Sequence, residues 1–118
     1  IWYMYDELFD TYKKEYDYLK INDQDEIKLI LNTCLDKYYD INDDKETWFN
    51  KVKLLAEELG YAANMKDYKK NPDSYKGNVA DIATVIRVSL TKQHMTPDLY
   101  EIMKLLGIER IKSRISKL

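Results

Sequence analysis

The stretch from Lys76 to Gly107 constrains the fold most strongly, because it predicts two consecutive helices joined by a short polar loop. In its first half, apolar residues recur at steps of three and four, which is the spacing of one helical face. Val85 and Val88 widen this face, so we expect other helices to surround the first helix. The residues of the face are Val79, Ile82, Ala83, Ile86 and Leu90.

The second half of this stretch carries start and stop signals for a helix. Thr96 is a candidate N-cap, and Pro97 suits the first helical position, where its missing N–H costs nothing. Asp98 and Glu101 fall in the first turn, where the positive end of the helix dipole favours acids. Gly107 is expected to end the helix in a left-handed conformation. The residues expected to face the core are Leu99, Ile102, Met103 and Leu106.

The rest of the chain predicts four more helices and one long polar connection. The acidic run Asp40–Asp44 is expected to cap a helix that ends at Gly60. The fold class is therefore all-α, a compact bundle or cage of about five to six helices. The helices are expected over residues 1–20, from Asn22 or Asp23 to about Tyr38, over 45–58 and over 108–118, and the connection over 61–77.

The last of these helices, residues 108–118, predicts a clear division into two faces. We expect Ile108, Ile111 and Ile115 to lie inward, because they recur at helical spacing. The basic residues are expected to point outward, namely Arg110, Lys112, Arg114 and Lys117.

Composition favours a single helical domain over residues 1–118. A chain of 118 residues is long enough for one core, and 45% hydrophobic residues with only three Gly and two Pro exclude a disordered or all-β chain. No apolar run approaches the ~20 residues that span a bilayer. Asp6 and Glu7 interrupt the only apolar stretch near the start, so we expect no signal peptide. Because the first residue is Ile, we expect a fragment of a longer protein.

Charge is distributed unevenly between the two halves of the chain. Residues 1–59 contain 8 Lys and Arg against 15 Asp and Glu, a net charge of −7, whereas residues 60–118 contain 11 against 6, a net charge of +5. This asymmetry predicts an acidic, solvated face and a basic face that can meet phosphates. A solvated surface without a partner is the alternative.

The sequence shows none of the common catalytic or metal-binding patterns. Three glycines are too few for a glycine-rich phosphate loop. His94 is the only histidine and has no Cys or His partner at metal-ligand spacing. Cys34 falls on the apolar face of its helix, where a small core residue is expected, and a single cysteine suits a cytosolic protein. We therefore expect this chain to catalyse nothing and to hold no metal or cofactor.

The connection over residues 61–77 is the most basic part of the chain. Its lysines are interleaved with Tyr68 and Tyr75, a pattern that suits single-stranded RNA, because rings stack on bases while ammonium groups lie beside phosphates. An inert surface loop is the alternative. The lysines are Lys66, Lys69, Lys70 and Lys76, of which the last three are candidate RNA contacts.

A family resemblance is carried by IRVSLTKQHMTPDLYEIMKLLGIERI, which begins at Ile86. This segment resembles the end of bacterial glutamyl-tRNA synthetases, whose pattern is roughly [LI]-R-V-A-[LV]-T-G-[RK]-x-x-[ST]-P-[DGE]-L-[YF]-E-[IV]-M-x-[LV]-[LM]-G. The similarity to clostridial-type members is continuous from about Asp43 to Arg110, and a weaker similarity is found at residues 5–9. The resemblance implies the helical anticodon-binding domain of a class I ligase.

The resemblance also implies the partners and the setting of the protein. A glutamate tRNA is the expected partner, a glutamine tRNA is left open, and the catalytic domain of the parent chain is the second partner. The parent enzyme would use ATP and Mg²⁺ in the cytoplasm, with no membrane involved. The alternative is a helical protein-interaction module, derived from the same domain, that no longer binds tRNA.

The resemblance places candidate RNA contacts on residues of the two-helix stretch. Arg87 matches the family arginine, and Thr96, Pro97 and Leu99 match the [ST]-P-x-L segment. An arginine fork can donate two parallel hydrogen bonds to a base edge or a phosphate, and N–H groups at a helix start attract anions. Leu99 can equally be a core residue.

Arg87 has a structural alternative as well. Its stem would then pack in the core while its head reaches an acid such as Asp81 or Glu101.

The chain departs from the family pattern at Thr91-Lys92-Gln93, where the family has Thr-Gly-[Arg/Lys]. If the family glycine has a positive φ, Lys92 must be strained or the loop must rearrange. Lys92 and His94 are the residues that can replace the missing basic charge. Either the loop has a changed anticodon preference, or the chain is a diverged paralogue that no longer reads tRNA.

Overall fold

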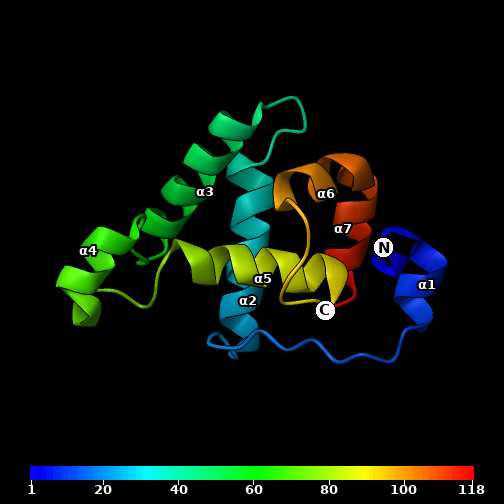
Figure 1. Cartoon of the computed structure of the whole chain (residues 1–118), viewed down its shortest axis with the longest axis horizontal. Coiled ribbons are helices and arrows are strands. Elements are labelled where there is room, and N and C mark those ends of the chain that lie inside the picture. Colours follow the sequence, from blue (N-terminus) through cyan, green and yellow to red (C-terminus); the bar gives the residue numbers. More distant parts are fainter.

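A computed structural model describes all residues from 1 to 118 and confirms the all-α class (Figure 1). No β-strand is present, only an isolated bridge between Ala62 and Asn78. No helix is long and apolar enough to cross a membrane. The helices are α1 (Asp6–Thr11), α2 (Gln24–Thr33), α3 (Lys45–Glu58), α4 (Met65–Lys70), α5 (Val79–Thr91), α6 (Leu99–Leu106) and α7 (Ile108–Ser116), with short helical turns η1 (Trp2–Met4), η2 (Cys34–Tyr38) and η3 (Pro72–Ser74).

Helix α5 is the centre of the fold, as its apolar pattern predicts. Figure 1 shows it crossing the middle of the molecule, with α3 and α4 towards one end and α6, α7 and α1 towards the other. It packs against α2, α3 and α7. Its start is fixed by a reciprocal capping box, in which Asn78 accepts from the Asp81 N–H and Asp81 accepts from the Asn78 N–H. The α5 side chains that are at most 2% exposed include Ile82, Val85, Ile86, Val88 and Leu90.

Three of the predicted helix boundaries are confirmed by their local geometry. Asp23 caps α2 by accepting from the N–H of Asp25, and Asp44 caps α3 by accepting from the N–H of Thr47 at 2.8 Å. Gly60 follows the end of α3 with a φ of +92°, a conformation that L side chains rarely adopt. These signals are local, which is why the sequence predicts them.

The helix predicted over residues 1–20 is wrong beyond Thr11. Only the short turn η1 and α1 are helical, and the chain then runs in an extended conformation from Tyr12 to Tyr18. The reason is an alternation of period two, since Tyr16 and Tyr18 both turn towards the body of the domain and stack at 6.3 Å. Tyr18 is 5% exposed and shares a hydrogen bond with the Ser89 hydroxyl of α5.

The connection over residues 61–77 is not irregular throughout. It contains α4, whose first turn is capped by Asn64, which accepts from the N–H of Asp67 at 2.8 Å. Pro72 then opens the turn η3. Because α4 is added to the six expected helices, the molecule has seven α-helices rather than five to six.

The outward orientation predicted for the basic residues of α7 is wrong for Arg114, which is only 1% exposed. Its guanidinium donates to the carbonyl oxygens of Tyr3 and Leu90 and pairs with Asp6. A buried charge loses its hydrogen bonds to water. Arg114 can lie inside because carbonyl oxygens of two distant segments accept hydrogen bonds in place of water.

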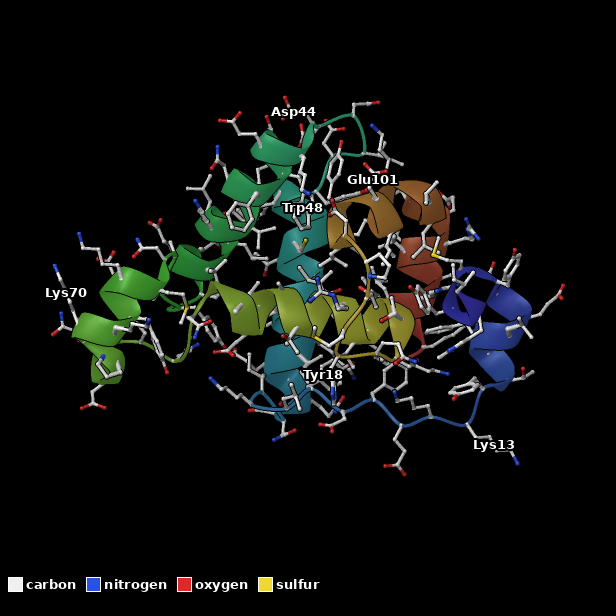
Figure 2. The ribbon with its side chains drawn as sticks, viewed as in Figure 1. Lys13, Tyr18, Asp44, Trp48, Lys70 and Glu101 are labelled. Atoms are coloured by element: carbon white, nitrogen blue, oxygen red, sulfur yellow. The ribbon has the colours of Figure 1, made fainter.

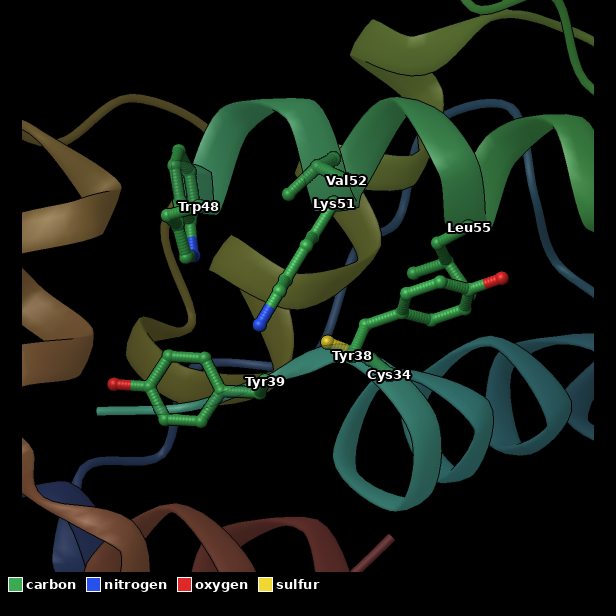
Figure 3. Close-up of a pocket in the computed structure, with 7 residues that line it drawn as sticks. All are labelled: Cys34, Tyr38, Tyr39, Trp48, Lys51, Val52 and Leu55. Carbon is green, nitrogen blue, oxygen red and sulfur yellow. The ribbon is translucent and has the colours of Figure 1, made fainter. Parts of the chain in front are cut away.

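The core contains one small cavity, between α3 and η2 (Figure 3). Its volume is about 10 Å³, which is room for at most one water and for no ligand. Trp48 lines the cavity and packs edge-on against Tyr100, so the structure gives it a packing role. The lining residues are Cys34, Tyr38, Tyr39, Trp48, Lys51, Val52 and Leu55.

Cys34 is expected to be unreactive in the folded chain. It is 6% exposed, and burial raises the pKa of its thiol to about 12. At pH 8 we expect a thiol reagent to label the native chain more than about a hundredfold more slowly than the urea-unfolded chain, because the thiolate is the reactive form. Equal labelling rates in the two conditions would contradict the burial of this residue.

Candidate nucleic-acid interface

The loop between α5 and α6, residues 92–98, brings together most of the predicted site residues. It begins with a tight turn in which Lys92 has a φ of 58° and a ψ of 24°, the left-handed conformation. Thr91 supports the turn, because its hydroxyl donates to the Arg87 carbonyl at 2.7 Å and accepts from the Gln93 N–H at 3.1 Å. A lysine therefore occupies the position where the family pattern has glycine, at a cost of about 1 kcal/mol in backbone strain.

Arg87 is tied to the far side of this loop. Its Nε donates to the Thr96 hydroxyl at 2.9 Å, and that hydroxyl donates in turn to the carbonyl of Pro97. No contact joins Arg87 to Asp81 or Glu101, so the structural alternative for its head group is not realised. The two terminal nitrogens of the guanidinium make no hydrogen bond within the chain, and the side chain is half-buried.

The electrostatic setting of Arg87 suits an anion or a base edge. Burial lowers the pKa of its guanidinium, while the nearby Asp98 carboxylate raises it, and an arginine remains charged at neutral pH. Asp98 is itself paired with Lys45 of α3, which lowers the pKa of the Asp98 carboxyl. The guanidinium of Arg87 is therefore held in place, and its two terminal nitrogens remain free to donate to a ligand.

The start of α6 differs from the prediction. Asp98, not Thr96, is the N-cap, and it accepts from the N–H of Tyr100 at 3.0 Å. Thr96 and Pro97 lie in the loop before the cap, so Pro97 does not occupy the first helical position. Leu99 is 3% exposed and belongs to the core cluster, which makes it a packing residue rather than a surface for RNA.

Lys92 also lies elsewhere than we predicted. It is 8% exposed, and its ammonium donates to the carbonyl oxygens of Phe9 at 2.7 Å and Tyr12 at 3.3 Å. The same ammonium lies 4.4 Å from the centre of the Phe9 ring, a cation–π contact. Burial lowers the pKa of Lys92. The sequence could not predict this placement, because the acceptors are about eighty residues away along the chain.

His94 lies at the surface of the loop and contacts the N-terminal segment. Its Nε2 donates to the Asp17 carbonyl at 2.9 Å, and the Asp17 carboxylate lies 3.4 Å from the same nitrogen. The ring is partly exposed and can also meet a ligand at the loop.

The three lysines predicted in the 61–77 segment are not part of this loop. Lys69 and Lys70 lie on the exposed surface of α4, and Figure 2 shows Lys70 at the far end of the molecule. Lys76 pairs with Glu26 at 3.1 Å and lies over the Tyr61 ring. The α4 lysines precede the start of α5 and the loop follows its end, so the whole of α5, about 20 Å long for its thirteen residues, lies between them.

One residue that sequence reasoning missed is Met95, at the tip of the loop. It is 86% exposed, more than any other large apolar side chain in the chain. It directly precedes Thr96, whose hydroxyl accepts from Arg87. The sequence signal for its exposure was its position, because it is a large apolar residue between polar neighbours in a predicted loop and so belongs to no apolar helix face.

Residues 68–118, which include α5, the loop and both following helices, match the family described as the anticodon binding domain. The match covers the C-terminal 51 of the 118 residues.

The whole chain is similar to glutamate–tRNA ligases. It is 47% identical over 116 residues to the enzyme of Acetivibrio thermocellus, covering 98% of this chain and 20% of that protein. The enzyme of Clostridium perfringens strain SM101 is 44% identical over 118 residues, 99% of this chain and 21% of that protein. The enzyme of Sorangium cellulosum is 35% identical over 117 residues, 99% of this chain and 20% of that protein.

The chain therefore spans about a fifth of the length of the curated relatives that it matches. The resemblance to clostridial-type glutamyl-tRNA synthetases is confirmed. No solved structure gives a significant match.

Proposed function

We propose that this chain is the anticodon-binding part of a glutamate–tRNA ligase and binds glutamate tRNA through the α5–α6 loop. The observation that carries the proposal is the Arg87 guanidinium, whose Nε is fixed by Thr96 while its two terminal nitrogens are left without a partner in the chain. A fork held in this way can donate two parallel hydrogen bonds to a base edge or a phosphate. The relatives and the domain family support the same role.

The contribution of such a domain is binding energy far from the reacting atoms. It would hold the tRNA so that its acceptor end reaches a catalytic domain elsewhere in the parent chain. No three His, Cys, Asp or Glu side chains of this chain lie together as a metal site, so the residues present do not fit the Mg²⁺ of such an enzyme. We expect ATP and Mg²⁺ to be held outside this chain, in a cytoplasmic enzyme.

The basic surface is smaller than the charge of residues 60–118 suggests. Arg114 and Lys92 are buried, Lys117 pairs with Asp10, and Arg110 donates to backbone carbonyls. The exposed lysines of α4 are the principal charges left for phosphates. Because α5, about 20 Å long, lies between them and the loop, one strand needs at least about six nucleotides to reach both. We propose that the loop selects the anticodon while α4 contacts the backbone.

Replacing Lys69 and Lys70 together with alanine is expected to reduce the slope of log affinity against log salt by about 2, because each phosphate contact contributes roughly one. The preference for the native anticodon should not change, since lysine–phosphate contacts carry no sequence information. Binding isotherms at four or five salt concentrations measure both quantities.

The matched control is Lys13→Ala with Lys28→Ala, which removes the same charge from exposed positions on other elements. An equal change of slope in both double variants would contradict a specific role for α4. A salt-independent affinity in the unmodified chain would instead point to a protein-docking domain, an alternative that the comparisons do not favour.

A further inference from the structure

The segment Tyr12–Leu19, here called the strap, is extended from Tyr12 to Tyr18 and lies along the end of α5 from which the loop emerges. Figure 1 shows it as the blue line running below α5, and Figure 2 labels Tyr18 beneath that helix. Residues 13–22 take part in no backbone–backbone hydrogen bond. Side chains alone therefore hold the strap against the domain.

The strap contacts the first three residues of the loop in order. Lys92 donates to the Tyr12 carbonyl, next to its bond with Phe9. Lys14 donates to the Gln93 side-chain oxygen at 3.0 Å. His94 is bonded to the carbonyl of Asp17 and paired with its carboxylate. Each contact joins residues more than seventy positions apart, so none of them follows from local chain geometry.

Lys92 is the deepest of these contacts. A lysine in the left-handed conformation is strained, and a buried ammonium loses its hydration. Both costs are offset by two charge-assisted bonds to carbonyl oxygens and by the Phe9 ring. The turn that opens the loop is thus anchored in the N-terminal segment as well as by Thr91 of α5.

The second half of the loop is fixed from the opposite side. Arg87 holds Thr96, and Lys45 of α3 holds Asp98. Met95, between the two sets of contacts, is left exposed at the tip. The strap and α3 therefore define the conformation in which the tip and the Arg87 fork are presented.

We propose that the strap is a positioning element for the RNA-contacting loop, with Lys92, Lys14 and Asp17 as positioning residues that touch no RNA. The inference rests on the proposed function, and it adds that anticodon selectivity depends on a segment outside residues 68–118, the part matched to the anticodon-binding family. Loosening the strap should let the loop sample other conformations and so reduce discrimination between anticodons.

The test uses two double variants that leave the net charge unchanged. Lys14→Ala with Asp17→Asn removes the strap's hydrogen bond to Gln93 and the carboxylate that lies 3.4 Å from His94 Nε2. Lys13→Ala with Glu15→Gln is the control, because both of these side chains are exposed and make no hydrogen bond or ion pair. Long-range electrostatics is the same in the two variants, so only local contacts differ.

Two readouts are taken for each variant: amide hydrogen exchange of residues 92–98, and the ratio of dissociation constants for glutamate tRNA and an anticodon-swapped tRNA. We expect the test variant to exchange about three- to tenfold faster and to lose a similar factor of discrimination, as weakened surface hydrogen bonds imply. Binding of the swapped tRNA should stay constant. Lys92→Gly, which relieves the backbone strain but removes the anchor, should show the larger loss.

Equal exchange and equal discrimination in the two double variants would overturn the inference and leave the proposed function intact. An unmodified chain that binds both tRNAs equally would contradict the proposed function. In that case hydrogen exchange still decides whether the strap holds the loop, and faster exchange in the test variant alone supports that it does.

Discussion

Replacing Arg114 with alanine is expected to lower the free energy of unfolding by about 3–5 kcal/mol, the largest effect of any single substitution that we predict. The guanidinium is 1% exposed, bonds the Tyr3 and Leu90 carbonyls, and lies 4.1 Å from the centre of the Phe9 ring. Alanine would leave these buried acceptors unpaired and open a cavity. Urea denaturation monitored by circular dichroism measures the change.

Two companion variants separate the causes of this loss. Lys112→Ala removes a charge from the exposed side of the same helix and should change stability by less than about 0.5 kcal/mol. Arg114→Lys keeps the charge but cannot donate to three acceptors in the same geometry, so we expect an intermediate loss. A loss below about 1 kcal/mol for Arg114→Ala would show that this arginine does not connect α7 to the N-terminal segment as described.

Replacing Arg87 with alanine is expected to weaken glutamate tRNA binding by about 1–3 kcal/mol, roughly a five- to 150-fold rise in dissociation constant. The fold should survive, because the terminal nitrogens of Arg87 have no partner in the chain and only the bond to Thr96 is lost. Fluorescence anisotropy gives the affinity, and a thermal melt of the same sample gives the stability.

Arg87→Lys is the matched control, since it keeps the positive charge without the planar fork. If the fork reads a base edge, lysine should restore little of the lost affinity; if it meets only a phosphate, lysine should restore most of it. Unfolding of Arg87→Ala, rather than loss of binding, would identify Arg87 as a structural arginine.

The parts of the fold that follow from local signals were predictable from the sequence. The Asp44 cap of α3, the Gly60 stop and the apolar surface of α5 each depend on residues within one or two turns. The resemblance located the candidate loop, because its motif lies within the matched stretch.

The placement of the buried cations was not predictable in the same way. Arginine and lysine usually lie at the surface. Arg114 and Lys92 are nevertheless buried, because they donate to backbone carbonyls 111 and 83 residues away. The periodicity of α7 assigned Arg114 to the outside, and the family resemblance assigned Lys92 to the RNA, because both arguments treat Lys and Arg as solvated. Long-range contacts of their own, such as the bond between Tyr18 and Ser89 of α5, explain why residues 12–18 are extended although their composition allows a helix.

The most direct measurement is fluorescence-anisotropy binding of the chain to glutamate tRNA and to the same tRNA with a swapped anticodon, at low and at physiological salt. We predict tighter binding to the native anticodon at both salt concentrations, with both affinities falling as salt rises. The difference between the two tRNAs should disappear in Arg87→Ala. Equal affinity for the two tRNAs in the unmodified chain would contradict anticodon recognition by the α5–α6 loop.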